Sequence, residues 1–298
     1  MNLPGVVSLL LTPFHHDGAI DWTSYEGYVD WQLSMKPAGL FAVCGSSEMH
    51  WLTLDERVIL ARRAVELANG TPVIATANLQ PERAAHADEI ARMADAGVSG
   101  VVLIPRSELA LEPERHLEYF LELIDTSDVP VFLYEWPQVE HYLLPREITA
   151  GLAPHVSGIK DTTCTPEGIG DKIDVAGEMV VYQANTPFLP DAIGLGARGY
   201  MAITSTCFAD LAIAAWEALQ HGTDERALTL HRELVFLDNL LVRAYPATAK
   251  YLVKRRGVEI ETVTRWPVRI EQEHIKALDV WMDCLPQDEF AGLRARGW

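Results

Sequence analysis

Short, continuously apolar runs alternate with amphipathic segments along most of the chain. The runs are rich in Val, Ile and Leu, which is typical of strands that are covered on both faces. The segments between them carry helical signals: Thr53 and Glu56 form a capping box, and Asn69-Gly70 marks a helix end. The pattern predicts strands over residues 6–11, 39–44, 72–77, 100–104, 129–134, 156–160, 179–183 and 199–203.

Strand and helix therefore alternate eight times with short connections, which predicts parallel strands joined by right-handed crossovers. Eight such units can close into a (β/α)₈ TIM barrel of the α/β class. In the helix before Gly97, the apolar face is predicted to consist of Ala87, Ile90, Ala91 and Ala94. Beyond residue 222 only helical patterns remain, at 224–242, 246–256 and 271–284. We expect a barrel over residues 1–222 and a C-terminal helical extension over 223–298, packed on the barrel.

Composition excludes several classes of protein. The 298 residues carry a formal net charge of −18, so we expect neither nucleic acid nor an anionic membrane surface as a partner. No apolar run is long enough to span a bilayer, and the first residues lack the pattern of a secretory signal. The histidines and the four cysteines match no metal-ligand spacing. We expect a cytoplasmic protein with no metal and no cofactor.

In a (β/α)₈ barrel the catalytic groups lie at the carboxyl ends of the strands. Of the six lysines in the chain, only Lys160 ends an apolar strand, and the other five lie in helical or loop patterns where a solvated amine is expected. Position alone leaves two interpretations of Lys160. It is either an amine nucleophile whose pKa is lowered by apolar surroundings, or one half of a buried ion pair with Asp161 or Glu48.

Two further strand ends carry candidate chemistry. Tyr134 ends the fifth predicted strand, where a phenol beside an amine can relay protons, although a lone tyrosine there is also a common anchor. The loop Cys44-Gly45-Ser46-Ser47 follows the second strand, and its hydroxyls and backbone N–H groups can hold a carboxylate or simply form a turn. We expect Trp51, Glu135, Trp136, Gln138 and His141 to border the entrance.

Six segments in order resemble the dihydrodipicolinate synthase and N-acetylneuraminate lyase superfamily of Schiff-base aldolases. The resemblance covers residues 4–257. It is carried by Leu11-Thr12-Pro13-Phe14 with Asp17-Gly18 and Asp21; Cys44-Gly45-Ser46-Ser47-Glu48 with Leu52 and Glu56; Tyr134-Glu135-Trp136-Pro137; Gly158-Ile159-Lys160-Asp161-Thr162-Thr163; Gly196-Ala197-Arg198-Gly199; and Pro246-Ala247-Thr248-Ala249-Lys250.

The resemblance implies a lyase that binds a small-molecule 2-oxo acid such as pyruvate. It assigns catalytic roles to Lys160 and Tyr134, and it implies substrate binding by Gly45, Ser46, Ser47, Thr162 and Met201. It also implies a homo-oligomer, a dimer or a homotetramer. Aligned on Glu48, the two carboxylate-binding hydroxyl positions of the family fall on Gly45 and Ser46; with a one-residue deletion they fall on Ser46 and Ser47.

Two departures bear on specificity. The second tyrosine of dihydrodipicolinate synthases is absent from residues 104–107, and their arginine after the tyrosine segment is absent from residues 138–141. We therefore expect little synthase activity. The leading hypothesis is a lyase or aldolase that makes or breaks a C–C bond; the alternatives are a Schiff-base dehydratase of a 2-oxo-3-deoxy sugar acid and a non-catalytic 2-oxo-acid-binding paralogue. If moderate salt sharply weakened substrate capture, Arg106 and Arg198 would be the first residues to mutate in search of a cationic surface path.

Overall fold

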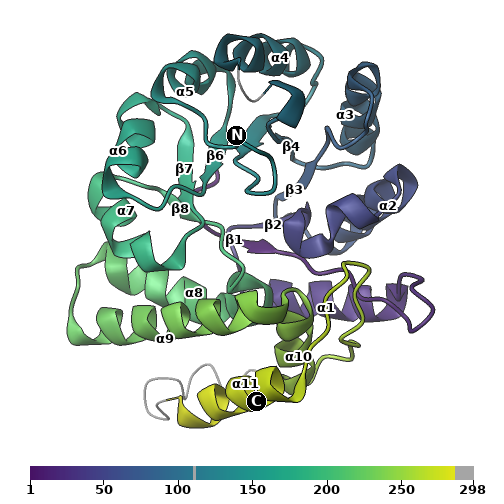
Figure 1. The fold of residues 1–298 in the computed structure, drawn as a ribbon, viewed down its shortest axis with the longest axis vertical. Coiled ribbons are helices and arrows are strands. Elements are labelled where there is room, and N and C mark those ends of the chain that lie inside the picture. The colour runs from purple at the N-terminus through teal and green to yellow at the C-terminus, as the bar shows by residue number, and fades with distance from the viewer. Residues whose placement is uncertain (110–111, 286–298) are drawn as a thin grey trace.

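A computed structural model describes residues 1–109 and 112–285. Within these residues, eight parallel strands form a closed barrel in chain order, and β8 pairs back with β1 (Figure 1). The predicted (β/α)₈ barrel is confirmed. The strands are β1 Gly5–Leu9, β2 Gly39–Val43, β3 Val73–Thr76, β4 Gly100–Leu103, β5 Val131–Tyr134, β6 Gly158–Asp161, β7 Val180–Gln183 and β8 Gly199–Tyr200.

Helices surround the strands and continue beyond them. The helices are α1 Trp22–Ser34, α2 Leu54–Leu67, α3 His86–Asp95, α4 Pro113–Asp125, α5 Arg146–Leu152, α6 Pro166–Val175, α7 Leu189–Leu195, α8 Ser205–Gln220, α9 Glu225–Leu241, α10 Ala247–Arg255 and α11 Gln272–Cys284. The capping box that predicted the start of α2 is present, because the Thr53 hydroxyl accepts from the Glu56 N–H and the Glu56 carboxylate accepts from the Thr53 N–H.

All eight strands are shorter than the predicted ranges, and β8 is shortened most. β8 ends at Tyr200 rather than at residue 203, because the chain turns toward α8 after the Met201 N–H donates to the Gln183 carbonyl at 3.0 Å. β5 begins at Val131 rather than at residue 129, since Pro130 has no N–H to donate to a neighbouring strand.

The apolar face predicted for the third barrel helix is correct only in part: Ile90 is buried, and Ala87 and Ala94 are half-buried. Helix α3 buries His86, Glu89, Ile90 and Met93, whereas Ala91 is exposed. Glu89 tolerates burial because Arg57 of α2 lies 3.1 Å from its carboxylate and two backbone N–H groups donate to it. A prediction of the buried face of α3 from its apolar residues alone misses Glu89, because Glu89 is buried through its pairing with Arg57.

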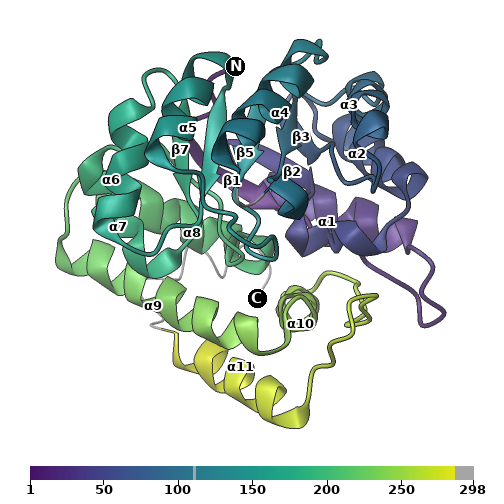
Figure 2. The ribbon, with the colours of Figure 1, turned by 45° about the horizontal axis from the view of Figure 1, so that its top comes forward.

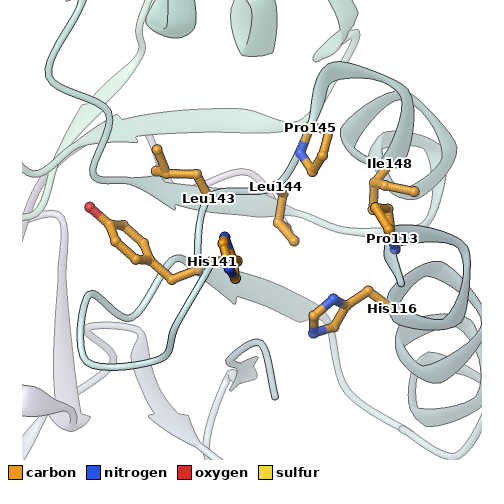
Figure 3. A pocket seen from close by; sticks show the side chains of 8 residues that line it. Pro113, His116, His141, Leu143, Leu144, Pro145 and Ile148 are labelled. Atoms are coloured by element: carbon orange, nitrogen blue, oxygen red, sulfur yellow. The ribbon is translucent and has the colours of Figure 1, made fainter. Parts of the chain in front are cut away.

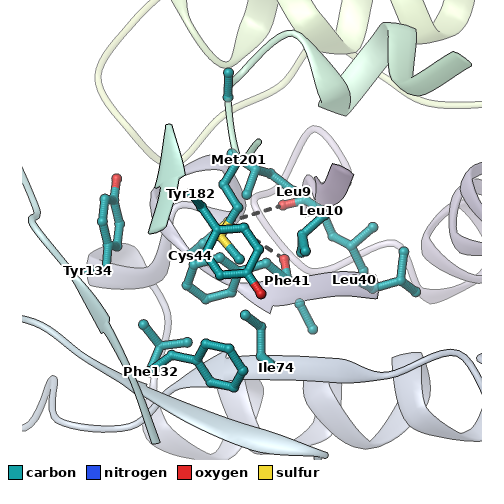
Figure 4. Close-up of a cluster of buried hydrophobic side chains, with 14 of the residues drawn as sticks. Leu9, Leu10, Leu40, Phe41, Cys44, Ile74, Phe132, Tyr134, Tyr182 and Met201 are labelled. Atoms are coloured by element: carbon teal, nitrogen blue, oxygen red, sulfur yellow. Dashed lines mark hydrogen bonds between the residues drawn. The ribbon is translucent and has the colours of Figure 1, made fainter. Parts of the chain in front are cut away.

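Large rings and glycines share the interior at the start of the strands. A Cβ on Gly158 would lie 2.7 Å from the ring of Tyr182, and one on Gly199 would lie 2.1 Å from it. Positions 158 and 199 therefore need glycine, because a side chain at either would collide with the ring of Tyr182 in β7. The rest of the interior is a continuous apolar cluster that includes Leu40, Phe41, Ile74 and Phe132 (Figure 4).

Helices α9, α10 and α11 form a group beside the barrel, coloured green to yellow in Figures 1 and 2. Helix α9 packs on α8, α10 packs on α8, and α11 packs on α9 and α10. The three helices predicted beyond residue 222 are thus present, while residues 286–298 of the expected extension lie outside the described residues. Among the described helices, none is both long and apolar enough to cross a bilayer.

Candidate active site

The carboxyl ends of the strands open into a cavity of about 420 Å³. Four of the residues predicted from the sequence line it: Lys160, Tyr134, Gly45 and Ser46. The other lining residues are Trp136, Pro137, Gln138, Ile203, Val242, Arg243, Ala244, Tyr245, Trp266 and Val268. Because enzymes of this fold place their chemistry at this end of the barrel, this cavity is the candidate active site.

Lys160 lies near the end of β6, and only 6% of its surface is exposed. Its ammonium nitrogen lies 4.0 Å from the centroid of the Tyr134 ring. Burial in these surroundings lowers the pKa of Lys160 to about 8. At pH 7.5 about a quarter of such side chains are free amines, compared with about 0.1% for a lysine of ordinary pKa.

The acidic residues that could neutralise Lys160 are paired with other lysines. Lys172 lies 3.1 Å from Asp161, and Lys250 lies 2.7 Å from Glu48. These pairs contradict the interpretation that Lys160 itself pairs with Asp161 or Glu48. They also show that the expectation of solvated amines at 172 and 250 is wrong, because α6 and α10 direct both side chains into the protein.

The ion pair of Lys172 includes a second carboxylate. The Nζ of Lys172 lies 3.2 Å from Oε1 of Glu135, and both Glu135 and Asp161 are fully buried. Burial raises the pKa of Glu135, and the charge of Lys172 opposes this shift. Glu135 follows Tyr134, and Asp161 follows Lys160, so this cluster fixes the ends of β5 and β6. It thereby positions the two candidate catalytic side chains.

Glu48 connects the loop after β2 to the C-terminal part of the chain. Its carboxylate accepts hydrogen bonds from Lys250 and from the backbone N–H groups of Arg265 and Trp266, each at 2.7 Å. Its backbone adopts the left-handed conformation, with φ of 60°, which costs a non-glycine residue about 1–2 kcal/mol. The charge-assisted bonds offset this cost and hold Trp266 over the cavity.

Tyr134 ends β5 with a buried ring that packs edge-on against Phe41 and Trp136. Figure 4 shows Tyr134 at the edge of the apolar cluster, with its hydroxyl directed away from Phe132. Burial raises the pKa of Tyr134 well above its ordinary value, so the phenol is protonated at neutral pH. It can therefore donate a proton to a reacting group and recover one.

The two serines of the loop after β2 have different environments. Ser47 is fully buried; its Oγ lies 2.8 Å from the carbonyl oxygens of Leu10 and Ala42 and accepts from the Cys44 N–H. Ser46 lines the cavity instead. Side-chain placement thus agrees with the alignment that puts Gly45 and Ser46 at the two hydroxyl positions.

Gly45 lies directly against the indole ring of Trp136 in the cavity wall. A Cβ at Gly45 would lie 2.4 Å from a ring carbon of Trp136, closer than real contacts allow. The ring of His50 stacks on the Trp136 indole, with 5.7 Å between the ring centroids. An aromatic surface therefore occupies the space that a hydroxyl side chain at position 45 would need.

Sequence reasoning missed the cavity residues that come from the C-terminal part of the chain. Tyr245 donates a hydrogen bond of 2.5 Å to Ser46, and burial raises its pKa well above the ordinary value. Arg243 is exposed at the cavity rim. Tyr245 directly precedes the motif Pro246–Lys250, which was the one sequence signal that pointed to it. Arg243 had no such signal.

Among the described lining residues, Lys160 and Arg243 carry positive charge and none is acidic. The cavity is therefore locally cationic in a chain of net charge −18. The arginines named from the sequence do not line this cavity: Arg106 donates to Glu108 and to backbone carbonyls. Arg198 precedes β8 and donates to the carbonyls of residues 178 and 179, at the opposite end of the barrel.

Two of the predicted substrate-binding residues, Thr162 and Met201, lie outside the cavity lining. Thr162 uses its N–H and its hydroxyl to bind Glu135, and Met201 packs in the apolar cluster near Cys44 (Figure 4). Of the residues expected at the entrance, Trp136 and Gln138 line the cavity, while Trp51 is not among its lining residues.

A second cavity of about 350 Å³ lies between α4 and the loop before α5 (Figure 3). It is lined by His116 and His141 among apolar side chains, and His116 is bound to the backbone of Arg106. It contains no lysine among the described residues that line it. In residues 1–109 and 112–285, His, Cys, Asp and Glu side chains form no group of three that could hold a metal ion.

Comparison with known proteins gives consistent results. The model of the dihydrodipicolinate synthetase family matches residues 2–282. The 4-hydroxy-tetrahydrodipicolinate synthase of Brucella suis is 28% identical over 93% of this chain and 96% of its own length. A DapA-like lyase of Pyrococcus horikoshii is 24% identical over 92% of this chain and 97% of its own.

Solved structures share the fold. Dihydrodipicolinate synthase DapA-2 of Bacillus anthracis has a TM-score of 0.89 at 22% identity, covering 96% of this chain and 99% of its own. YagE, a prophage protein of the dihydrodipicolinic acid synthase family from E. coli K12 in complex with pyruvate, has a TM-score of 0.85 at 20% identity. The match covers 94% of this chain and 97% of YagE.

Proposed function

The chain belongs to the dihydrodipicolinate synthetase family of lyases, and we propose that it is a class I enzyme in which Lys160 forms a Schiff base with a 2-oxo acid. One observation carries the proposal. The Lys160 amine is buried, its pKa is lowered to about 8, and the neighbouring carboxylates are occupied by Lys172 and Lys250. This arrangement leaves a nucleophilic amine facing a cavity.

The chemistry starts with addition of the Lys160 amine to the C2 carbonyl of the oxo acid. Loss of water gives an iminium, and the protonated phenol of Tyr134 supplies and recovers the protons that these steps need. The iminium acidifies C3, so that loss of a proton there gives an enamine. The enamine carbon adds to an aldehyde to form the C3–C4 bond, and the reverse sequence cleaves it.

The carboxylate of the oxo acid needs hydrogen-bond donors near Lys160. Ser46 lines the cavity, and its hydroxyl accepts from Tyr245 and is thereby oriented to donate into the cavity. The positive charges of Lys160 and Arg243 favour an anion in this space. Pyruvate is the first acid to test, since the related YagE is described in complex with it.

Borohydride trapping tests the proposal directly. The protein is incubated with pyruvate or with a 2-oxo-3-deoxy sugar acid, reduced, and analysed by intact mass and peptide mapping. We expect one added acid per chain, located at Lys160, and none in Lys160→Arg, because arginine stays protonated and cannot attack a carbonyl. Modification of Lys172 or Lys250 instead, or no trapping with any 2-oxo acid, contradicts the proposal.

A further inference from the structure

The cavity wall beyond Lys160 and Tyr134 is mainly apolar and partly aromatic. Seven of its side chains offer no hydrogen bond or only an indole N–H: Trp136, Pro137, Ile203, Val242, Ala244, Trp266 and Val268. Apart from the residues already assigned to the oxo acid, Gln138 and Arg243 are the polar side chains in the described lining. A buried hydroxyl without a partner costs about 1–3 kcal/mol. A polyhydroxylated chain is therefore poorly matched to this wall.

Trp136 lines the cavity beside Tyr134, next to the position that the proposed chemistry gives to the second reactant. The new bond forms at C3 of the oxo acid, beside the Tyr134 phenol, and the ring centroids of Tyr134 and Trp136 are 5.5 Å apart. Trp136 is 7% exposed, and the absence of a side chain at Gly45 leaves room for its ring. The group carried by the aldehyde carbon thus meets an indole surface, which favours a flat, aromatic group.

Arg243, at the rim of the same cavity, favours a negatively charged group on the second reactant. It lies in the short 3₁₀ turn Val242–Ala244 that follows α9, and no hydrogen bond or ion pair engages its guanidinium within the described residues. A guanidinium at the mouth of an apolar cavity is suited to a carboxylate or another anionic substituent.

We propose that the carbonyl partner of this enzyme is an aromatic aldehyde with an anionic substituent, whose ring contacts Trp136 and whose anion pairs with Arg243. This inference rests on the Schiff-base function proposed above. The enamine carbon C3 bonds to the aldehyde carbon, the aldehyde oxygen gains a proton and becomes the 4-hydroxyl, and water hydrolyses the iminium. The product is a 4-aryl-4-hydroxy-2-oxo acid, and no oxidant or reductant is consumed.

The test compares aldehydes in condensation with pyruvate. The panel is 4-carboxybenzaldehyde, 2-carboxybenzaldehyde, benzaldehyde and glyceraldehyde, with product quantified by liquid chromatography and mass spectrometry. We expect kcat/KM to be highest for a carboxybenzaldehyde and at least about tenfold lower for glyceraldehyde, the size of effect given by a well-packed aromatic contact.

Two substitutions separate the ring from the charge. Trp136→Leu removes the flat surface and should lower kcat/KM about tenfold for both kinds of aromatic aldehyde; Trp136→Phe keeps a ring and should retain most of it. Arg243→Gln should lower kcat/KM about fivefold for the carboxylated aldehydes and leave benzaldehyde unchanged. Arg226→Gln, an equal charge change at the exposed start of α9, is the matched control and should change neither.

The outcomes distinguish this inference from the function on which it rests. Trapping of pyruvate at Lys160 is measured for every variant and also reports that the protein is folded. If trapping succeeds but glyceraldehyde reacts fastest, or Arg243→Gln affects carboxylated and plain benzaldehyde equally, the inference is wrong and the Schiff-base function stands. If Lys160 traps no oxo acid, both are wrong.

Discussion

Replacing Lys172 with methionine tests whether the buried cluster beside Lys160 helps to keep the Lys160 amine unprotonated. In the native protein the Lys172 ammonium lies 3.2 Å from Glu135 and 3.1 Å from Asp161, and all three side chains are buried. Lys172→Met keeps the length and the packing of the side chain but leaves two buried carboxylates without a cation. Two measurable effects follow, one on stability and one on the Lys160 amine.

The magnitudes can be worked out from the cluster. Removing one partner of a buried pair costs about 3–5 kcal/mol of unfolding free energy, which is a large part of the stability of a typical domain. The uncompensated negative charge near the end of β6 also favours protonated Lys160. An increase of about one unit in its pKa, from about 8 to about 9, would reduce the free amine at pH 7.5 about eightfold.

The assay is the rate of pyruvate trapping at Lys160 between pH 6 and pH 10, together with urea unfolding at pH 7.5. The midpoint of the rate should lie near pH 8 in the native protein and about one unit higher in Lys172→Met. Lys276→Met removes an exposed lysine from α11 and is the control that should change neither quantity. Adding Glu135→Gln to Lys172→Met removes one uncompensated charge and should recover part of both losses.

One result would refute the reasoning. If Lys172→Met is destabilised as expected but its trapping midpoint stays at the native pH or falls, the cluster supports the fold without controlling the charge of Lys160. The low pKa of Lys160 would then follow from its burial without a contribution from the cluster.

Three further predictions use other parts of the site. Ser46→Ala should raise the KM for pyruvate severalfold with little loss of stability, whereas Ser47→Ala should cost about 1–3 kcal/mol in urea unfolding, because its buried hydroxyl is hydrogen-bonded to the backbone. Gly45→Ser should destabilise the protein by about 1–3 kcal/mol, since its Cβ would meet the indole ring at 2.4 Å; an unchanged melting temperature would contradict this. The pKa of Glu56 is lowered from 4.5 to about 2, mainly by a hydrogen bond from Arg265. Its stabilisation should be complete above pH 4.5 and lost as the pH falls toward 2, so the stability gap between the native protein and Glu56→Gln should close on acidification.

The barrel was predictable because its signal is local. A strand covered on both faces has to be apolar along its whole length, and this leaves a mark that does not depend on what the strand pairs with. The strand-end rule then isolates Lys160 and Tyr134, which both line the cavity. The capping box of α2 is equally local, since both of its residues belong to the same turn.

The errors concern groups whose environment depends on distant partners. Lys172 and Lys250 look solvated in sequence because nothing near them shows that Asp161 and Glu48 will reach them across the fold. Glu89 is hidden on an otherwise apolar helix face for the same reason. Arg243 was missed because a strand-end rule does not include a turn between two helices of the extension.

The wall of the cavity has a consequence for how such enzymes diversify. Tyr134 and Lys160 belong to β5 and β6, while Arg243, Trp266 and Val268 belong to a stretch after α9. Part of the cavity wall is therefore encoded far from Lys160 and Tyr134, whereas Trp136 follows Tyr134 by only two residues. Exchanging residues 242–268 between relatives would change this part of the wall and leave Lys160 and Tyr134 in place, provided that Lys250 and Tyr245, which bind Glu48 and Ser46, are kept.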